Sequence, residues 1–275
     1  MGSIRRCAGS AREYANTCAV VTYETIKVQF QESTCFLQID RPQAGNTISS
    51  RLVAELHDVL SACEESATIL VLSGTPEVFC MGADFKAIAG ASKNGCKQDD
   101  SLEPLYDLWL RLATGPYVTI SHVRGKANAG GVGFVAASDI VLADGSAQFS
   151  LSELLFGLYP ACVLPFLIRR VGSQKAHYLT LMTQPILARQ ACEWGLVDAY
   201  EPLSDALLRR HLQRLRRLSK VAIRRYKTYM SRVSAPLQYL KSSAVAANLE
   251  IFSDAGNLQA ITRYVEQGVF PWEKL

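Results

Sequence analysis

Two kinds of apolar pattern alternate along the chain, and this alternation limits the fold more than any other feature. Residues 69–74 begin with a short, wholly apolar run, as expected of a parallel strand that is covered on both faces. Residues 49–65 repeat apolar side chains at intervals of three and four, which predicts an amphipathic helix. A helix at 102–113 and strands at 118–123 and 140–143 continue the order. The pattern therefore predicts an α/β fold with right-handed β-α-β units around a mostly parallel sheet.

The two ends of this pattern differ from its middle. Alternating residues at 23–30 and 35–39 flank a polar turn and predict a β-hairpin ahead of the parallel strands. Beyond Leu187 we expect no further strand, and the periodicity predicts helices at residues 188–194, 205–230, 237–252 and 257–264.

These elements suggest a division of the chain. We expect an α/β core at residues 20–200 and a helical C-terminal region at residues 201–275. Residues 1–19 precede the first patterned segment, and we expect them to form a disordered extension. Residues 90–101 are polar and contain glycines, which predicts a mobile loop.

Composition excludes several classes of protein. The net charge of +4 is too small for a dedicated nucleic-acid binder. The eight cysteines contain no CxxC pair and the four histidines have no ligand spacing, so we expect buried thiols in a reducing cytoplasm and no metal site. No apolar run approaches the roughly 18 residues of a membrane helix, and the N-terminus lacks the apolar stretch of a signal peptide. We therefore expect a cytoplasmic protein.

Two glycine-containing turns could hold a ligand. The first spans residues 79–85 (Phe-Cys-Met-Gly-Ala-Asp-Phe), and the second spans 125–133 between a strand and an apolar helix. Small residues let a ligand approach the backbone, and two free N–H groups directed at one carbonyl oxygen would form an oxyanion hole. The structural alternative is that these glycines only permit tight turns and close packing. A nucleotide-phosphate loop fits poorly, because neither GxxxxGK[ST] nor GxGxxG is present.

A third segment contains a carboxylate among apolar residues. Ser150 and Glu153 have the spacing of a capping box, which would explain the glutamate as the start of a helix. Alternatively, Leu151, Leu154 and Leu155 desolvate the Glu153 carboxyl enough for it to exchange protons near neutral pH.

Together the three segments resemble the enoyl-CoA hydratase (crotonase) superfamily, and the resemblance extends over residues 21–272. The family patterns F-x-x-G-A-D and G-x-x-x-G-G-G match residues 79–84 and 125–131, with Ala129 in place of one glycine. The pattern A-x-F-x-x-x-E-x-x-x-G is matched by Ala147, Phe149, Glu153 and Gly157.

The resemblance implies a fold and a catalytic device. The fold would be a crotonase-like spiral of β-β-α units with a C-terminal helical region that mediates a homotrimer or a dimer of trimers. The backbone N–H groups of Ala83 and Gly130 would hold a thioester oxygen, and Glu153 would be the acid/base. Asp84 and Gly131, in the same two turns, would lie beside the substrate, with Asp84 bonding the turn rather than acting as a catalyst.

One departure from the family narrows the expected activity. Hydratases have a second glutamate just after the glycine-rich turn, where this chain has Gly133. Long stretches, including residues 76–79, 103–109, 115–125 and 150–170, resemble the dehydratases of HMG-synthase cassettes in polyketide β-branching. Those enzymes convert 3-hydroxy-3-methylglutaryl (HMG) on an acyl carrier protein to 3-methylglutaconyl. The alternatives are an enoyl-thioester isomerase, a methylglutaconyl decarboxylase of the same fold, and a non-catalytic RNA-binding or scaffold protein.

The resemblance also implies how the substrate is bound. The acyl group would be carried on phosphopantetheine of the carrier protein, or on coenzyme A, without a further cofactor. Lys86 and Lys126 are candidates for its distal carboxylate, although a solvated surface position also explains them. The segment 205–230 is strongly basic, which indicates either a solvated helix face or a docking surface for an acidic carrier or for the phosphates of coenzyme A, with RNA not favoured as a ligand. Whether Asn128, Tyr159 or Cys162 assists Glu153 stays open.

Overall fold

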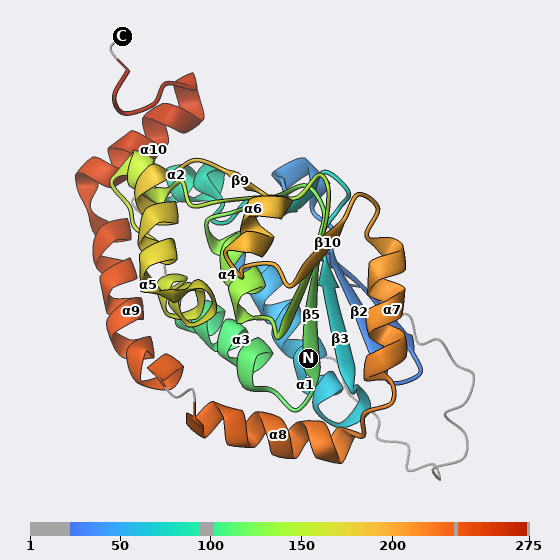
Figure 1. Cartoon of the computed structure of the whole chain (residues 1–275). Helices are drawn as coiled ribbons and strands as arrows, with labels where there is room; N and C mark the ends of the chain where they lie inside the picture. The colour runs from blue at the N-terminus through green and yellow to red at the C-terminus, as the bar shows by residue number, and fades with distance from the viewer. Residues whose placement is uncertain (1–22, 94–101, 234–235, 274–275) are drawn as a thin grey trace.

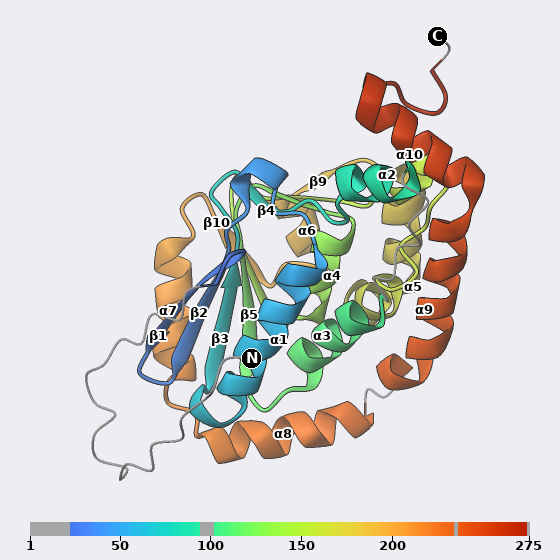
Figure 2. The same cartoon turned by 180° about the vertical axis from the view of Figure 1, so that it is seen from behind.

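The computed structural model describes residues 23–93, 102–233 and 236–273, and its largest element is a six-stranded sheet (Figures 1 and 2). The strand order is β1-β2-β3-β5-β7-β10, in which β1 and β2 pair antiparallel and every later pairing is parallel. The predicted hairpin and parallel core are therefore confirmed. The strands are β1 (Ile26–Gln31), β2 (Thr34–Ile39), β3 (Ile69–Ser73), β5 (Val118–Val123), β7 (Ile140–Asp144) and β10 (Ala199–Glu201).

Strand β10 contradicts the prediction that no strand follows Leu187. It has three residues, none of them fully buried, so it lacks the apolar run that identified β3 and β5. Parallel pairing with β7 extends the sheet at this edge, with Ala199 opposite Leu142.

Helices cover both faces of this sheet. On one face lie α1 (Ser50–Ser66), α3 (Glu103–Thr114) and α4 (Gly130–Ala137), whose buried side chains join the main core. The Ser49 hydroxyl accepts a hydrogen bond from Leu52 N and so caps α1. On the other face lies α7 (Asp205–Leu215), whose Leu207 and Leu212 pack on a second apolar cluster with β3, β5 and β7. The continuous apolar run of β3 is thus explained by burial on both sides.

A second, smaller sheet was not predicted. Its order is β4-β6-β8-β9, with β4, β6 and β8 parallel. Each strand has only two or three residues, too few to show a period, and β6 lies inside the glycine-containing turn. Because parallel strands end at the same edge, the segments that follow β4, β6 and β8 are brought together there. The strands are β4 (Val78–Cys80), β6 (Lys126–Asn128), β8 (Gln148–Ser150) and β9 (Ile186–Leu187).

Several helices complete the fold, and two predictions about them need correction. The basic segment 205–230 forms two helices, α7 and α8 (Lys220–Val233), because α7 packs on the sheet whereas α8 turns beneath it. Residues 90–93 belong to α2 (Phe85–Lys93) rather than to a loop, and 94–101 lie outside the described residues, as does the extension 1–19. Helix α5 was not predicted. The remaining elements are α5 (Leu164–Met182, kinked at Gly172), α6 (Ala188–Glu193), α9 (Pro236–Ser253), α10 (Ala255–Gln267) and the short 3-10 helices η1 (Pro42–Ala44) and η2 (Glu153–Phe156).

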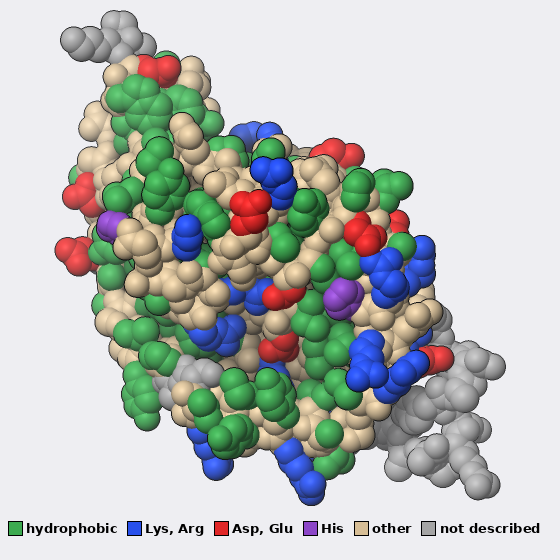
Figure 3. Space-filling view, viewed as in Figure 1, with side chains coloured by type: hydrophobic (Ala, Val, Ile, Leu, Met, Phe, Trp, Pro, Cys, Tyr) green, Lys and Arg blue, Asp and Glu red, His purple; other side chains and the backbone are tan. Residues whose placement is uncertain are grey.

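Part of the basic character of α7 and α8 serves the fold. Lys227 is buried in an ion pair with Asp139, and Lys220 donates to the carbonyls of Cys63 and Ala67. Arg216 and Arg217, between the two helices, are exposed. Figure 3 shows other Lys and Arg side chains projecting at the lower edge, where α8 lies.

Four of the five described cysteines are buried and all five are free thiols. Within the described residues, no helix combines the length and the apolar character that crossing a bilayer requires.

Candidate active site

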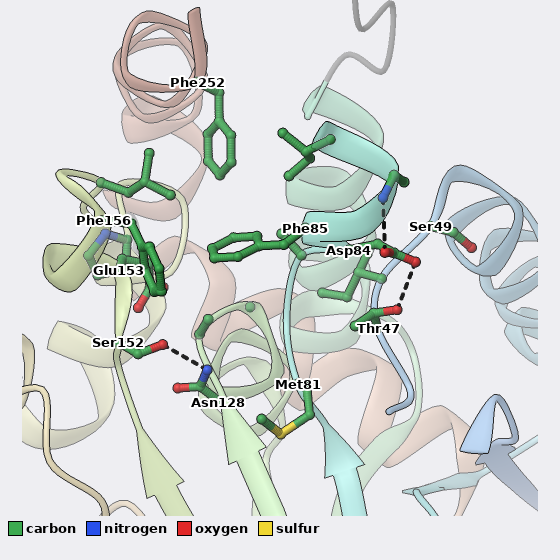
Figure 4. A pocket seen from close by; sticks show the side chains of 18 of the residues that line it. Thr47, Ser49, Met81, Asp84, Phe85, Asn128, Ser152, Glu153, Phe156 and Phe252 are labelled. Carbon is green, nitrogen blue, oxygen red and sulfur yellow. Dashed lines mark hydrogen bonds between the residues drawn. The ribbon is translucent and has the colours of Figure 1, made fainter. Parts of the chain in front are cut away.

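A cavity of about 2140 Å³ opens at the edge where β4, β6 and β8 end (Figure 4). Residues from all three motif segments line it, among them Ala83, Gly130 and Glu153. Helices α2, α9 and α10 contribute an apolar wall that includes Phe85 and Phe252. The small sheet thus gathers segments that are far apart in the sequence around one space.

The two glycine-containing turns touch backbone to backbone. Gly82 has φ +83°, and a Cβ there would lie 2.6 Å from Ala129 Cβ and 3.0 Å from Gly130 N. A Cβ at Gly131 would lie 2.1 Å from Cys80 O. Both positions therefore require glycine, and this close approach brings the first turn against the start of α4.

Two backbone N–H groups are free at this contact. Among the described residues, neither Ala83 N nor Gly130 N donates to a protein acceptor. Ile48 bridges the first turn through a 2.8 Å bond to Gly82 O and leaves the Ala83 N–H unused. Gly130 is the first residue of α4, where an N–H has no partner within the helix and carries the positive end of the helix dipole. Both N–H groups are therefore available to an acceptor in the cavity, and their sharing of one thioester oxygen stays a prediction.

Ala129 stands between the turn and α4 in a strained conformation. Its φ of 51° and ψ of −123° lie in a region that favours glycine. The family pattern has glycine here, so this chain keeps the backbone path without the residue best suited to it.

Glu153 opens the short helix η2 directly after β8 and Ser152. Burial raises the pKa of the Glu153 carboxyl to about 7, against the opposing effect of the Ser152 and Glu153 backbone N–H groups. Its Oε2 is inaccessible to solvent and has no hydrogen-bond partner within the described residues. Phe156 lies beside it in Figure 4, and the Phe85 ring is 5.0 Å from the Phe156 ring. Desolvation thus favours proton exchange near neutral pH, as the second interpretation of this segment predicted.

The capping-box interpretation is wrong. Ser152, not Ser150, is the N-cap of η2, and its side chain makes no capping bond. The Ser150 hydroxyl instead donates to Asn128 Oδ1 at 2.8 Å, and Asn128 Nδ2 donates to Ser152 Oγ at 2.9 Å. This chain of three polar side chains joins the ends of β6 and β8 and lines the floor of the cavity, where Figure 4 shows the bond between Asn128 and Ser152.

Ser150 and Ser152 were missed as partners of Asn128. Their spacing is that of a strand end, where residues two apart lie on one face, and this is the only signal that could have found them.

The predicted substrate-binding residues fall into two groups. Lys86 and Lys126 line the cavity from exposed positions, so both can reach an anion at its mouth. Asp84 is tied into the fold: its Oδ1 accepts from Ala87 N at 3.2 Å and its Oδ2 from Thr47 Oγ1 at 3.1 Å. The first bond lies at the start of α2, the second ties the turn to Thr47, and both agree with a turn-bonding role. A contact of any of the three with a substrate stays a prediction.

Cys162 and Tyr159, the other side chains that could assist Glu153, differ in their contact with the cavity. Cys162 Sγ donates to Ala244 O at 3.5 Å, and burial raises the pKa of its thiol to about 12. Tyr159 lines the cavity and is half exposed. No group of three or more His, Cys, Asp or Glu residues suited to a metal ion occurs in the parts of the chain that the structure describes. None of the lining residues belongs to α7 or α8: α8 lies at the lower end of the molecule in Figure 2, and α7 packs against the large sheet.

Comparison with known proteins gives consistent matches. A family model described as enoyl-CoA hydratase/isomerase matches residues 29–274. The chain is 60% identical over 255 residues to the bacillaene synthase dehydratase PksH of Bacillus subtilis, covering 92% of this chain and 98% of that protein. The crystal structure of PksH superposes with a TM-score of 0.89, covering 91% of this chain and 100% of that one. The 1,2-epoxyphenylacetyl-CoA isomerase of Escherichia coli is 32% identical over 200 residues, 70% of this chain and 75% of that protein.

Proposed function

The chain belongs to the enoyl-CoA hydratase/isomerase family, and we propose that it dehydrates 3-hydroxy-3-methylglutaryl on an acyl carrier protein to 3-methylglutaconyl in polyketide β-branching. The observation that supports this most is a single desolvated carboxyl, Glu153, in one cavity with two free backbone N–H groups. The similarity to a dehydratase of polyketide synthesis gives the reaction class, a hydro-lyase.

The two N–H groups act first. The thioester oxygen binds between Ala83 N and Gly130 N, and negative charge moves onto it when the α-proton leaves. Such donors are fixed before the reaction and hold this charge without reorganising, which makes the α-proton more acidic. Loss of one oxyanion donor typically raises the barrier by about 3–4 kcal/mol.

Glu153 then serves twice. Its carboxylate removes the α-proton, so that the α-carbon–hydrogen bond breaks and an enolate forms. When the β-carbon–oxygen bond breaks, Glu153 returns the proton to the departing hydroxyl. Water and the α,β-alkene result, and Glu153 is again a carboxylate. A pKa of about 7 suits both transfers, because neither protonation state is strongly disfavoured at neutral pH.

The cavity can receive a substrate on a long arm. It extends from the floor formed by Asn128 and Ser152 to the exposed side chains of Lys86 and Lys126. We propose that these two lysines attract the distal carboxylate and that phosphopantetheine of the carrier protein, or coenzyme A, delivers the acyl group without any other cofactor. We further propose that the functional unit is a homotrimer or a dimer of trimers, as in the family it belongs to.

Because α7 and α8 contribute nothing to the cavity, their exposed cations are a solvated face rather than the docking surface in this proposal. Reversing the charges of Arg216 and Arg217 is therefore expected to leave the salt-dependent affinity for carrier protein unchanged.

The first experiment is intact-protein mass spectrometry of HMG-loaded carrier protein after incubation with the wild type and with Glu153→Ala. We expect the wild type to remove one water and the variant to remove none. If the wild type leaves the mass unchanged, the dehydratase proposal is wrong. Assays of β,γ-enoyl thioesters for isomerisation, and of 3-methylglutaconyl thioesters for loss of carbon dioxide, would then separate the two related activities. A non-catalytic protein would give no difference between wild type and variant in any of them.

A further inference from the structure

Position 133 faces a tryptophan instead of open space. Gly130 and Gly133 lie nearly one turn apart on the same side of α4. A Cβ at Gly133 would lie 2.4 Å from Trp109 Cζ2 and 2.7 Å from both Cε2 and Cη2 of the same ring. These distances are below any ordinary carbon–carbon contact, so the indole already occupies the volume in which a side chain of residue 133 would begin.

The Trp109 ring is also held in place. It projects from α3, is 1% exposed, and makes edge contacts with Phe134 and Phe166, each with ring centroids 5.9 Å apart. A shift large enough to admit another side chain would disturb this packed cluster. The ring therefore cannot move aside at low cost.

The same ring borders the candidate active site. Trp109 lines the cavity, and its Cζ2 lies 3.8 Å from where a Cβ of Gly130 would be. Its Nε1 has no hydrogen-bond partner among the described residues, although a buried indole N–H usually finds one. The ring therefore contributes its shape and its apolar surface beside the oxyanion donor, and no internal polar bond.

We propose that Trp109 determines the specificity of the site, by filling the space through which a side chain at position 133 would reach the thioester. The inference deepens the proposed function, on which it rests for the reaction. With the indole in place, Glu153 is the only carboxylate among the described lining residues that the fold does not already bind, because Asp84 accepts from Ala87 N and Thr47 Oγ1. The site then favours a substrate that one carboxylate can process, and not the unbranched enoyl thioesters whose hydration uses two.

Electrostatics favours the same arrangement. Two carboxylates in one desolvated site repel each other and raise one another's pKa. A substrate that carries its own carboxylate would add a third negative group. An apolar ring beside Gly130 removes this repulsion and leaves the pKa of Glu153 near 7.

The packing part of the proposal is tested without any substrate. Thermal unfolding is measured for Gly133→Ala, Trp109→Leu and the double variant, with Gly90→Ala as the matched control, because a Cβ there would meet nothing within 4 Å. Overpacking predicts that Gly133→Ala lowers the Tm by roughly 5 °C in the wild type and by much less in the Trp109→Leu background. An equal loss in both backgrounds would overturn the proposal.

The specificity part is tested by hydration of 2-butenoyl coenzyme A. Gly133→Glu alone is expected to stay inactive, whereas Trp109→Ala with Gly133→Glu gains hydration by about 100-fold over either single variant. Equal gain by Gly133→Glu alone, or no gain by a double variant with a native circular dichroism spectrum, contradicts the proposal. A further outcome is that the wild type fails to dehydrate HMG on its carrier while the Tm loss still depends on Trp109 and the double variant still gains hydration. The proposed substrate is then wrong and the role of Trp109 stands.

Discussion

Two glutamates, one beside each sheet, have carboxyl groups whose pKa is shifted in opposite directions. Glu55, on α1 beside the large sheet, accepts hydrogen bonds from the backbone N–H groups of Glu24 and Thr25 and pairs with Arg51 at 2.8 Å. Burial acts to raise its pKa, but these bonds outweigh burial and lower it. Glu153, at the end of the small sheet, is partly exposed as a residue, but its Oε2 is buried without a hydrogen-bond partner among the described residues, and burial raises the pKa of its carboxyl to about 7.

This difference in hydrogen bonding separates a carboxyl group that stabilises the fold from one that can exchange protons. A carboxylate that is satisfied in the folded state ties β1 to α1 and stays charged. A carboxylate with one buried oxygen left without a partner destabilises the fold but is ready to take a proton. If this division is real, substitutions beside the large sheet will change mainly stability, and substitutions at the end of the small sheet will change mainly the rate.

The largest effect is expected at Glu153. Replacing it by glutamine removes the only proposed base, and general acid–base catalysis typically contributes 10²–10⁴-fold, so we expect a rate loss of roughly that size. Thermal stability should be unchanged or raised, because a neutral amide replaces an ionisable carboxyl whose buried Oε2 has no partner among the described residues. Steady-state kinetics and thermal unfolding of the same preparation measure both.

The pH dependence of stability follows from the raised pKa of Glu153. In the unfolded chain the carboxyl ionises near 4.5, whereas the folded protein keeps the proton to about 7. Between these values the folded state binds more protons, so wild-type stability falls as pH rises through this window, by an amount on the order of 3 kcal/mol. Glu153→Gln should lack this loss, and its stability relative to the wild type should rise from pH 4.5 to 7. Parallel curves in denaturant titrations would contradict the prediction.

The pKa of Glu153 also predicts the pH dependence of the rate. The carboxylate is the active form for removal of the α-proton, so kcat/KM of the wild type should rise with pH through a midpoint near 7. A midpoint below pH 5 would mean that Glu153 is not the group that titrates.

A smaller and opposite result is expected at Glu55. Glu55→Gln loses charge-assisted bonds to Thr25 and Arg51, each typically contributing about 1.5–3 kcal/mol, so we expect a loss of about 2 kcal/mol in the free energy of unfolding. Activity per folded molecule should be retained. The lowered pKa means that this contribution is present above the unfolded pKa and is lost as pH falls through the folded value. The variant should therefore differ least from the wild type in acid.

The same division explains what the sequence could predict. The apolar runs and amphipathic periods of the large sheet and its helices predicted that region from β1 to β7 with small errors at the ends. Strands β4, β6 and β8 have three residues each, so no period exists to be recognised. Local pattern singled out the two glycine-containing turns and Glu153 but left a structural explanation open for each, and the family resemblance alone assigned roles to Ala83, Gly130 and Glu153.

Other features depend on contacts that no local pattern contains. The role of Ser150 was misjudged because its spacing to Glu153 fits a cap, whereas its partner Asn128 comes from another strand. Trp109 reads as an ordinary core residue of α3, and only the fold brings it against Gly133. The break between α7 and α8 follows from packing on different parts of the molecule, while the cations run through both helices without interruption.

The polar chain at the floor of the cavity gives the next test. Ser150→Ala removes the 2.8 Å bond that orients the Asn128 amide. One hydrogen bond typically contributes about 1 kcal/mol, so we expect kcat to fall by up to about tenfold with a smaller change in KM. The matched control is Ser73→Ala in the large sheet, where the hydroxyl makes a long 3.4 Å bond to Leu37 O, and there the rate should not change. Equal effects on kcat at both serines would mean that the small sheet contributes no more to the rate than the large sheet does.

The smallest effect is expected at Ala129, where the small sheet stores strain. Its φ of 51° and ψ of −123° are open to glycine but cost an alanine on the order of 1–3 kcal/mol, part of which is offset by the greater freedom of glycine in the unfolded chain. Ala129→Gly should therefore raise the free energy of unfolding by about 1 kcal/mol, and keep the rate within about twofold because the backbone path to Gly130 is unchanged. Ala137→Gly, in the last turn of the same helix, is the control and should lose about 1 kcal/mol. Destabilisation by both changes would mean that the observed backbone angles carry no strain, and that Ala129 is a turn residue like any other.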